Sequence, residues 1–318
     1  MLKINKEISI IIPVYNEEKI IDTCIQTFLI EFKKLSNYKF NLIIIDDGSN
    51  DKSYEIIRKY VLSNNNIKSL KLSKNYGSHI AISAGLNQAR DSDAVIVCPV
   101  DDYYMVENLK NILNEHEKGY DIVWTIRKNR SKNFFSNFFS SIFYIIFKYL
   151  SGFKNYPKTG TSAFFLISKK VCKNFYHFME TNRVVNMLIF SMGYSQSYIY
   201  TNEAKPIRKS KYNFFSKLKI AIDSIVSYSY VPMRIISTIG IIVSILSFIY
   251  MSIVLKDYFF SDIEIEGWTT IVVLMLLLGG FQLLGFGILG EYIWRIFNET
   301  KKNPLYLVDR KDGFNSKD

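Results

Sequence analysis

Apolar and polar positions alternate along the first 125 residues in a way that predicts strands and helices in turn. Short, continuous apolar runs are separated by longer stretches in which apolar residues recur every three or four positions. Strands that alternate with helices of this length form βαβ units, so we expect an α/β fold with a mostly parallel sheet. The predicted strands are residues 8–13, 40–45, 67–72, 94–98 and 120–126, and the predicted helices are 17–35, 51–60, 78–89 and 106–117.

Polar and acidic residues follow three of these strands directly. Residues 13–17 end the first strand, Asp46 and Asp47 end the second, and Asp101 and Asp102 come just after the fourth. The carboxyl ends of parallel strands meet at one edge of the sheet, where open α/β sheets bind their ligands. Each group alone is equally typical of a turn that caps a helix, but together they predict a ligand site at this edge.

The middle of the chain carries two segments that we expect to lie on a membrane surface. Residues 133–150 are aromatic and almost uncharged between basic flanks, and residues 213–228 have one apolar helical face. The first segment is too short to span a bilayer, so an amphipathic helix in the interface plane fits it, with a buried core helix as the alternative. Between these segments, residues 160–168 and 194–200 are predicted strands, and 169–178 and 184–192 are predicted helices.

Two later segments are long and apolar enough to cross a membrane. Residues 231–255 and 268–294 each exceed the roughly 20 apolar residues that a span requires. The loop between them is acidic, whereas both outer flanks are basic. The positive-inside bias therefore predicts a multi-pass protein of the plasma membrane, with both termini and the α/β domain on the cytoplasmic side. Glycines in the second span allow close helix approach, either within the hairpin or between the protomers of a homo-oligomer.

The charge is concentrated in one region. The net charge is +11, and residues 125–219 hold 17 lysines and arginines but only two acids. This predicts an anionic partner such as nucleic acid, phosphates or acidic lipid headgroups, unless the basic residues form a solvated face. Nucleic acid does not account for the two spans, so we expect no nucleic-acid partner. The three cysteines are far apart and indicate neither a zinc site nor a disulfide framework.

Four short motifs occur in a specific order: PVYNEE at 13–18, IDDGSNDKS at 45–53, NYG at 75–77 and VDD at 100–102. Near the end of the chain stand GEYIWRIF at 290–297 and KKNPLY at 301–306. The ordered set resembles family-2 glycosyltransferases with the GT-A fold, which is Rossmann-like. The final motifs resemble bacterial polyisoprenyl-phosphate glycosyltransferases, relatives of dolichol-phosphate mannose synthase. The resemblance covers nearly the whole chain.

The resemblance implies an inverting sugar transfer from a nucleotide-sugar to a polyprenyl phosphate such as undecaprenyl phosphate, for cell-surface glycan synthesis or modification. In this family, the residue that matches Asp46 reads the base. Tyr15 fits stacking on uracil, so a UDP-sugar is the preferred donor. The residues expected to bind the nucleotide are Pro13, Tyr15, Asn16, Glu17, Asp46, Asp47 and Gly77.

The resemblance also implies a divalent metal, Mg²⁺ or Mn²⁺, on the donor diphosphate. Asp101 and Asp102 are the expected ligands, because hard carboxylate oxygens suit these ions. The chain departs from the family pattern at this place. Pro99 stands where the family has the first aspartate of an Asp-x-Asp motif, and a proline side chain cannot bind a metal.

The acceptor side is expected to be cationic. A phosphate monoester has a second pKa of about 6, so at cytoplasmic pH it needs positioning and charge compensation more than a general base. Arg127 is similar in position to the family residue that holds the acceptor phosphate, and with Asp101 and Asp102 it completes the expected catalytic set. The residues expected to contact the acceptor phosphate are Arg127, Arg130, Lys205, Arg208 and Lys211.

Two alternatives stay open. One is a transferase of the same fold with another lipid or glycan acceptor, although a processive synthase would carry a Gln-x-x-Arg-Trp motif that this sequence lacks. The other is a catalytically degenerate, membrane-anchored partner protein, which Pro99 suggests. The expected organisation is a nucleotide-sugar part (1–132), an acceptor-side part with the interfacial helices (133–230), a membrane hairpin (231–297) and a cytoplasmic tail (298–318).

Overall fold

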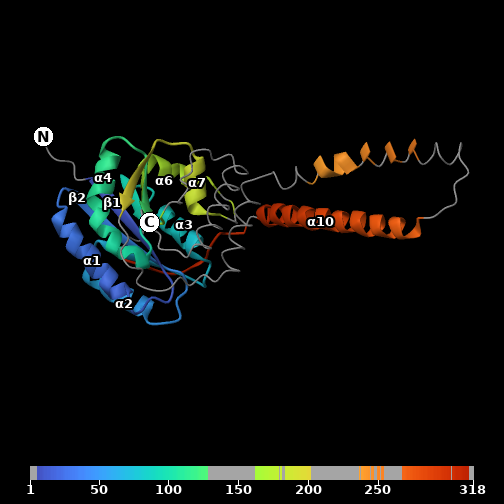
Figure 1. Cartoon of the computed structure of the whole chain (residues 1–318). Coiled ribbons are helices and arrows are strands. Elements are labelled where there is room, and N and C mark those ends of the chain that lie inside the picture. Colours follow the sequence, from blue (N-terminus) through green and yellow to red (C-terminus); the bar gives the residue numbers. More distant parts are fainter. Residues whose placement is uncertain are drawn as a thin grey trace, which may run out of the picture. The chain divides into compact units, whose positions relative to one another are not determined.

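The computed structural model describes residues 6–127, 162–178, 180, 183–201, 267–301 and 303–314, and short helical pieces between residues 236 and 253 (Figure 1). These residues fall into two compact units. The first holds the residues up to 201 together with 303–314, and the second holds the helical residues from 236 to 301. The candidate ligand site lies in the first unit.

Eight strands form one sheet in the first unit, in the order β7-β5-β6-β4-β1-β2-β3-β8. The four strands β4, β1, β2 and β3 run parallel, as do β5 and β7, whereas β6 and β8 are antiparallel to their neighbours. The predicted α/β fold with a mostly parallel sheet is confirmed. The strands are β1 (Lys6–Val14), β2 (Tyr38–Asp46), β3 (Ile67–Leu72), β4 (Ala94–Val97), β5 (Ile122–Arg127), β6 (Phe165–Ser168), β7 (Gln196–Thr201) and β8 (Val308–Asp312).

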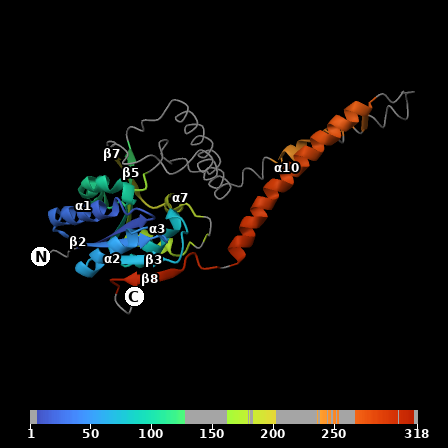
Figure 2. The ribbon, with the colours of Figure 1, turned by 90° about the horizontal axis from the view of Figure 1, so that it is seen from below.

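Helices cover both faces of this sheet (Figures 1 and 2). One face packs against α1 (Ile21–Lys34), α2 (Ser53–Ser63) and α4 (Leu109–Glu117), whose apolar side chains join those of β1 and β2 in the core. The other face packs against α3 (Ser78–Gln88) and α6 (Lys169–Phe175), with α7 (Val185–Ser191) beside them. Because strands buried on both faces need apolar residues throughout, β1 and β2 are nearly continuous apolar runs.

Two elements differ from the sequence expectation. Residues 100–108 form a 3-10 helix, η1 (Val100–Asn108), so α4 begins at Leu109 rather than at 106. Strand β8 lies within residues 298–318, which the sequence assigns to a tail. Its residues, VDRKD, are charged and largely exposed, because β8 forms an edge of the sheet. Such an edge strand carries no apolar run by which a sequence pattern could detect it.

The second unit contains α10 (Trp268–Thr300), which begins at the predicted start of the second span. Large apolar side chains are exposed along it, among them Met275, Leu283 and Phe286. Glu291 and Arg295 form an ion pair one turn apart, 3.1 Å between oxygen and nitrogen, as their spacing predicts. None of the helices in the described part of the chain combines the length and the unbroken apolar character that a bilayer span requires.

The membrane hairpin therefore stays a prediction. The expected interfacial helices, 133–150 and 213–228, lie outside the described residues, as does much of the first predicted span, 231–255.

Candidate functional site

The loop after β1 is bound tightly to the loop after β2. Val14 is the register partner of Asp46, so the two strands end side by side. The Asn16 amide donates to Ser49 Oγ (2.9 Å), and Asn16 Oδ1 accepts from the Asn50 amide (2.9 Å). Asn16 has a φ of +53°, a left-handed conformation that asparagine tolerates better than most residues.

Three further bonds extend this contact between the two loops. The Glu17 amide donates to Ser53 Oγ (2.8 Å), and the Glu18 amide donates to Asp51 Oδ2 (3.1 Å). Glu18 returns the interaction by accepting from the Lys52 amide (3.2 Å). The first two motifs thus form one rigid unit, in which several of their polar residues satisfy each other's backbone.

The two acids that end β2 are buried at the centre of this unit. Asp47 receives two backbone bonds from the loop after β3, from the Tyr76 amide to Oδ1 (2.8 Å) and from the Gly77 amide to Oδ2 (2.9 Å). Gly77 has a φ of +94°, which favours glycine at this turn. Asp47 therefore ties the third motif to the first two.

Asp46 differs from its neighbour in having one unused oxygen. Asp46 Oδ2 accepts from the Ser49 amide (3.3 Å), whereas Oδ1 is buried and has no hydrogen-bond partner among the described residues. A buried acceptor without a partner is unfavourable, so this oxygen is suited to accept a hydrogen bond from a ligand.

Burial dominates the electrostatics of this acid pair. Burial raises the pKa of Asp46, against the opposing effect of the hydrogen bonds from Ser49. It also raises the pKa of Asp47 to about 6, because the bonds from Tyr76 and Gly77 only partly offset desolvation and the neighbouring Asp46 adds to the rise. Two adjacent buried carboxylates therefore favour a ligand that supplies N–H donors or positive charge.

The acids of the fourth motif stand on η1, directly after β4. Strand β4 lies beside β1, so η1 begins at the same edge as the motif loops. Pro99 precedes the helix, and its carbonyl accepts from the Asp102 amide (2.9 Å). Asp102 is buried and accepts from Tyr104 Oη (3.3 Å), whereas Asp101 is half-buried in the first turn of η1.

The carboxylate oxygens of Asp101 and Asp102 suit a divalent metal, but two side chains are too few to complete its coordination. Among the described residues no group of three or more His, Cys, Asp or Glu side chains could hold a metal ion. A metal at this edge would therefore take its remaining ligands from a bound diphosphate or water, as Mg²⁺ commonly does.

The residues predicted to bind the acceptor phosphate are largely outside the described part of the chain. Arg127 is the last residue of β5, where its backbone is the register partner of Thr201 on β7. Strand β5 is parallel to β4, so Arg127 follows the sheet to the same edge as Asp101. Arg130, Lys205, Arg208 and Lys211 lie outside the described residues.

Residues 183–185 contact α3, which packs on the face of the sheet opposite α1. The sequence pattern did not mark Arg183 as a functional residue. Arg183 is buried and donates from Nη1 to Ser83 Oγ on α3 (3.2 Å). The Val185 amide donates to His79 Nδ1 (3.4 Å), and burial lowers the pKa of His79 to about 4. His79, near the start of α3, thus joins that helix to α7. Arg183 is a single arginine between a polar stretch (180–182) and two valines, a pattern that forms no motif by which it could be found.

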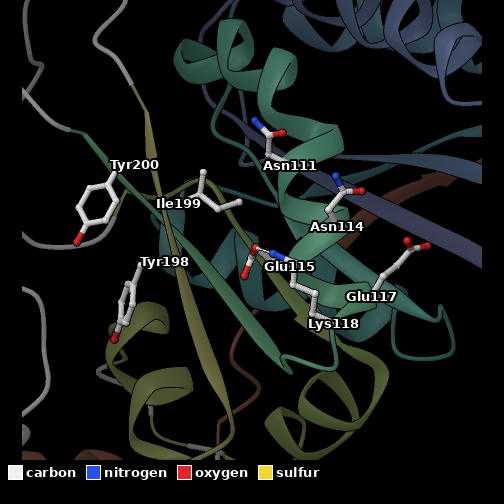
Figure 3. Close-up of a pocket in the computed structure, with 8 residues that line it drawn as sticks. All are labelled: Asn111, Asn114, Glu115, Glu117, Lys118, Tyr198, Ile199 and Tyr200. Atoms are coloured by element: carbon white, nitrogen blue, oxygen red, sulfur yellow. Dashed lines mark hydrogen bonds and ion pairs between the residues drawn. The ribbon is translucent and has the colours of Figure 1, made fainter.

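A separate hollow of about 680 Å³ lies between α4 and the edge strand β7 (Figure 3). In Figure 3, Ile199 points toward α4, whereas Tyr198 and Tyr200 point away from it. Strands β5 and β6 separate β7 from β4, and the hollow contains none of the predicted site residues. Its lining residues are Asn111, Asn114, Glu115, Glu117, Lys118, Tyr198, Ile199 and Tyr200.

The family model for glycosyl transferase family 2 matches residues 9–184, which include all four motifs at the edge of the sheet. The chain belongs to this family, and it is a glycosyltransferase. The expected GT-A architecture and enzyme class are thereby confirmed.

The chain is similar over nearly its full length to bacterial and phage relatives. It is 33% identical to "Uncharacterized glycosyltransferase YkcC" of Bacillus subtilis over 312 residues, which cover 97% of this chain and 95% of the relative. It is 30% identical to "Bactoprenol glucosyl transferase" of Shigella phage SfII over 307 residues, which cover 96% of this chain and 98% of the relative.

A solved structure, glucosyl-3-phosphoglycerate synthase from Mycobacterium tuberculosis with Mn²⁺ and UDP, aligns with 70% of this chain and 78% of its own. The two share 14% sequence identity with a TM-score of 0.44.

Proposed function

We propose that this glycosyltransferase moves a sugar from a nucleotide-sugar, preferably a UDP-sugar, to a polyprenyl phosphate such as undecaprenyl phosphate. The reaction inverts the anomeric centre and takes place at the cytoplasmic face of the plasma membrane, for cell-surface glycan synthesis. The proposed acceptor is supported by the names of relatives that align with nearly the whole chain. These relatives are named for bactoprenol, a polyprenyl carrier. The predicted membrane hairpin and interfacial helices would bring the enzyme to such a lipid.

The single observation that carries the donor proposal is the buried acid pair where three motif loops meet. Asp46 Oδ1 has no partner among the described residues, and the imide N–H of uracil is a donor of the type it requires. Tyr15 is half-buried in the same loop as Asn16 and offers an aromatic face for the base. A base bound in this way would place its diphosphate toward the strand ends, where β4 delivers Asp101.

Asp101 and Asp102 would hold the metal, Mg²⁺ or Mn²⁺. When bound, such an ion would neutralise the charge that develops on the leaving nucleoside diphosphate. Asp102 is already oriented by Tyr104, and Asp101 is half-buried at the start of η1. Pro99 leaves this chain with two neighbouring carboxylates rather than a spaced pair.

The acceptor requires cations rather than a base. A polyprenyl phosphate is mostly dianionic at neutral pH and is itself the nucleophile, so its oxygen attacks the anomeric carbon as the bond to the diphosphate breaks. Arg127 would hold this phosphate in line with the donor, supported by Arg130, Lys205, Arg208 and Lys211. We expect no essential histidine, in keeping with the structural contact of His79.

The test is a panel of UDP-, GDP- and CDP-sugars incubated with the purified full-length protein, undecaprenyl phosphate and Mn²⁺. We expect labelled lipid with a UDP-sugar and a higher melting temperature in the presence of UDP. Absence of labelled lipid with every donor, together with no nucleotide-dependent thermal shift, would reject the proposal and favour the degenerate partner. Transfer to another lipid or glycan but not to the polyprenyl phosphate would reject the acceptor assignment alone.

A further inference from the structure

The segment that follows α10 in the chain returns to the sheet as β8, beside β3. β8 pairs with β3 in antiparallel fashion, with Ser69 opposite Asp312 and Leu72 opposite Val308. Strand β3 leads directly into the loop whose Tyr76 and Gly77 amides bind Asp47. The start of β8 is therefore next to the loop that completes the buried acid site.

A short series of hydrogen bonds joins this segment to that loop. The Ser73 amide donates to the Leu307 carbonyl (2.9 Å), and Ser73 Oγ lies 3.1 Å from Tyr76 Oη. From Tyr76, the series continues through its amide to Asp47. Three hydrogen bonds thus connect Leu307 with the buried carboxylate of Asp47 in the proposed donor site.

The segment is held to the domain at several other points. Tyr306 Oη accepts from Asn87 Nδ2 on α3 (3.2 Å), and Tyr54 on α2 donates to Asp312 Oδ2 (2.5 Å). Lys71 of β3 lies over the Tyr54 ring, 4.8 Å from its centre. These contacts to α2, β3 and α3 make the segment a part of the first unit.

We infer that residues 303–314 are a positioning element of the donor site, which holds the loop 73–77 in the conformation that binds Asp47. The turn after β2 contacts this loop through Asp47 and Gly48, whereas on the side of β8 the exposed residue Ser73 is bound by its amide to Leu307. The inference rests on the proposed function, because it assumes that the acid site binds the nucleotide. The consequence is that the chain beyond α10 affects donor affinity without contacting the donor.

The decisive comparison is between two shortened versions of the full-length protein. One ends at residue 314 and keeps every contact described above, and the other ends at residue 302 and loses all of them. Amide hydrogen exchange is measured without nucleotide, and UDP affinity and steady-state kinetics are measured on the same samples. In the chain that ends at 302, we expect exchange at 73–77 to be about tenfold faster and UDP binding to be five- to tenfold weaker, as the loss of a few hydrogen bonds implies.

A positioning role and a general structural role differ in where the exchange increases. Positioning predicts an increase confined to β3 and the loop 73–77, with an unchanged KM for the acceptor. Exchange that rises equally in β1 and β2 would overturn the inference, as would unchanged exchange at 73–77. Failure of the chain that ends at 314 to bind any nucleotide would reject the proposed donor site, while the exchange data would still decide whether the segment positions the loop.

A milder variant covers the case in which the chain that ends at 302 does not fold. Ser73→Ala combined with Tyr306→Phe removes two side-chain bonds and leaves the β8 backbone in place. We expect about threefold weaker UDP binding, from the partial loss of these bonds. The matched control is Tyr38→Phe, which removes a hydroxyl bond to Glu117 elsewhere in the domain and should leave UDP binding unchanged. Equal UDP affinity of the double variant, the control and the parent would overturn the inference.

Discussion

Gly48 lies against the backbone of Lys74 with no room for a side chain between them. A Cβ on Gly48 would come within 2.4 Å of the Lys74 carbonyl carbon and 2.7 Å of its Cα. Gly48 also has a φ of +68°, a left-handed conformation that favours glycine. The turn after β2 and the loop after β3 are therefore in direct backbone contact, beside the bonds that Asp47 makes to the same loop.

We predict that Gly48→Ala separates these two loops. The new methyl group must displace the Lys74 backbone, and alanine also disfavours the left-handed conformation by about 1–2 kcal/mol. We expect the free energy of unfolding to fall by more than this conformational cost, and UDP binding to weaken. Chemical denaturation and nucleotide titration of the variant measure the two effects.

Gly119→Ala is the matched control. Gly119 has a φ of +98°, but a Cβ there would meet no atom within 4 Å, so it reports the conformational cost without a collision. It should leave UDP binding unchanged. Equal losses of stability and of affinity in the two variants would contradict the steric explanation.

The contrast between Asp46 and Ser73 shows how far the sequence predicts this site. Asp46 ends an apolar run, and runs of this kind located β3 at residues 67–72 as well as the edge that carries Asp101. The Ser73 amide, in contrast, bonds to Leu307, which is 234 positions away and directly precedes the exposed, charged strand β8. No local periodicity encodes such a contact, because the pairing of β8 is decided by the free edge of β3 and by side chains on α2 and α3. The 3-10 helix η1 was likewise not predicted, since the sequence pattern indicated a helix only from residue 106.

We predict a specific pH dependence of stability from Asp47. Its pKa is raised from 3.8 to about 6 in the folded protein, so the folded state holds the proton more tightly than the unfolded chain. The stability that it contributes is present below pH 3.8 and is lost as the pH rises to about 6. The free energy of unfolding of the parent, relative to that of Asp47→Asn, should therefore decrease between pH 3.8 and about 6, by about 3 kcal/mol at most. Above this range the difference should stay constant.

Asp51, in the same loop, should change stability with pH in the opposite direction. Burial acts to raise its pKa, but hydrogen bonds from the Ser53 and Glu18 amides hold that pKa below its usual value. Its stability contribution is therefore lost as the pH falls, and the parent relative to Asp51→Asn should become less stable toward acid. Thermal unfolding of the three proteins as a function of pH tests both slopes. Parallel curves for parent and Asp47→Asn would contradict the raised pKa of Asp47.

Asp101 should determine the metal dependence of the reaction. Asparagine keeps the shape of the side chain but removes the charge that a divalent ion requires, so Asp101→Asn should lower turnover at least tenfold and shift half-maximal activity to higher Mn²⁺. Activity is measured after EDTA treatment, with Mn²⁺ added back in steps. Tyr104→Phe is the control, because it removes the 3.3 Å bond to Asp102 but keeps both carboxylates, and it should lower activity about threefold or less. Unchanged turnover and metal response in Asp101→Asn would reject its role as a ligand.

Arg127 should act on the acceptor rather than on the donor. It ends β5, two strands away from β4, whereas the motif loops that would bind the nucleotide follow β1, β2 and β3. Arg127→Ala should therefore raise the KM for undecaprenyl phosphate by about tenfold or more, as expected for the loss of a charged hydrogen bond, and leave UDP affinity within about twofold. Arg127→Lys keeps the positive charge but lacks the planar guanidinium, so its KM for undecaprenyl phosphate should lie between those of the parent and Arg127→Ala. Arg90→Ala, an exposed arginine beside Asp91 outside the site, serves as the control for lost positive charge. A fall in nucleotide affinity with an unchanged KM for the lipid would show that Arg127 belongs to the donor site.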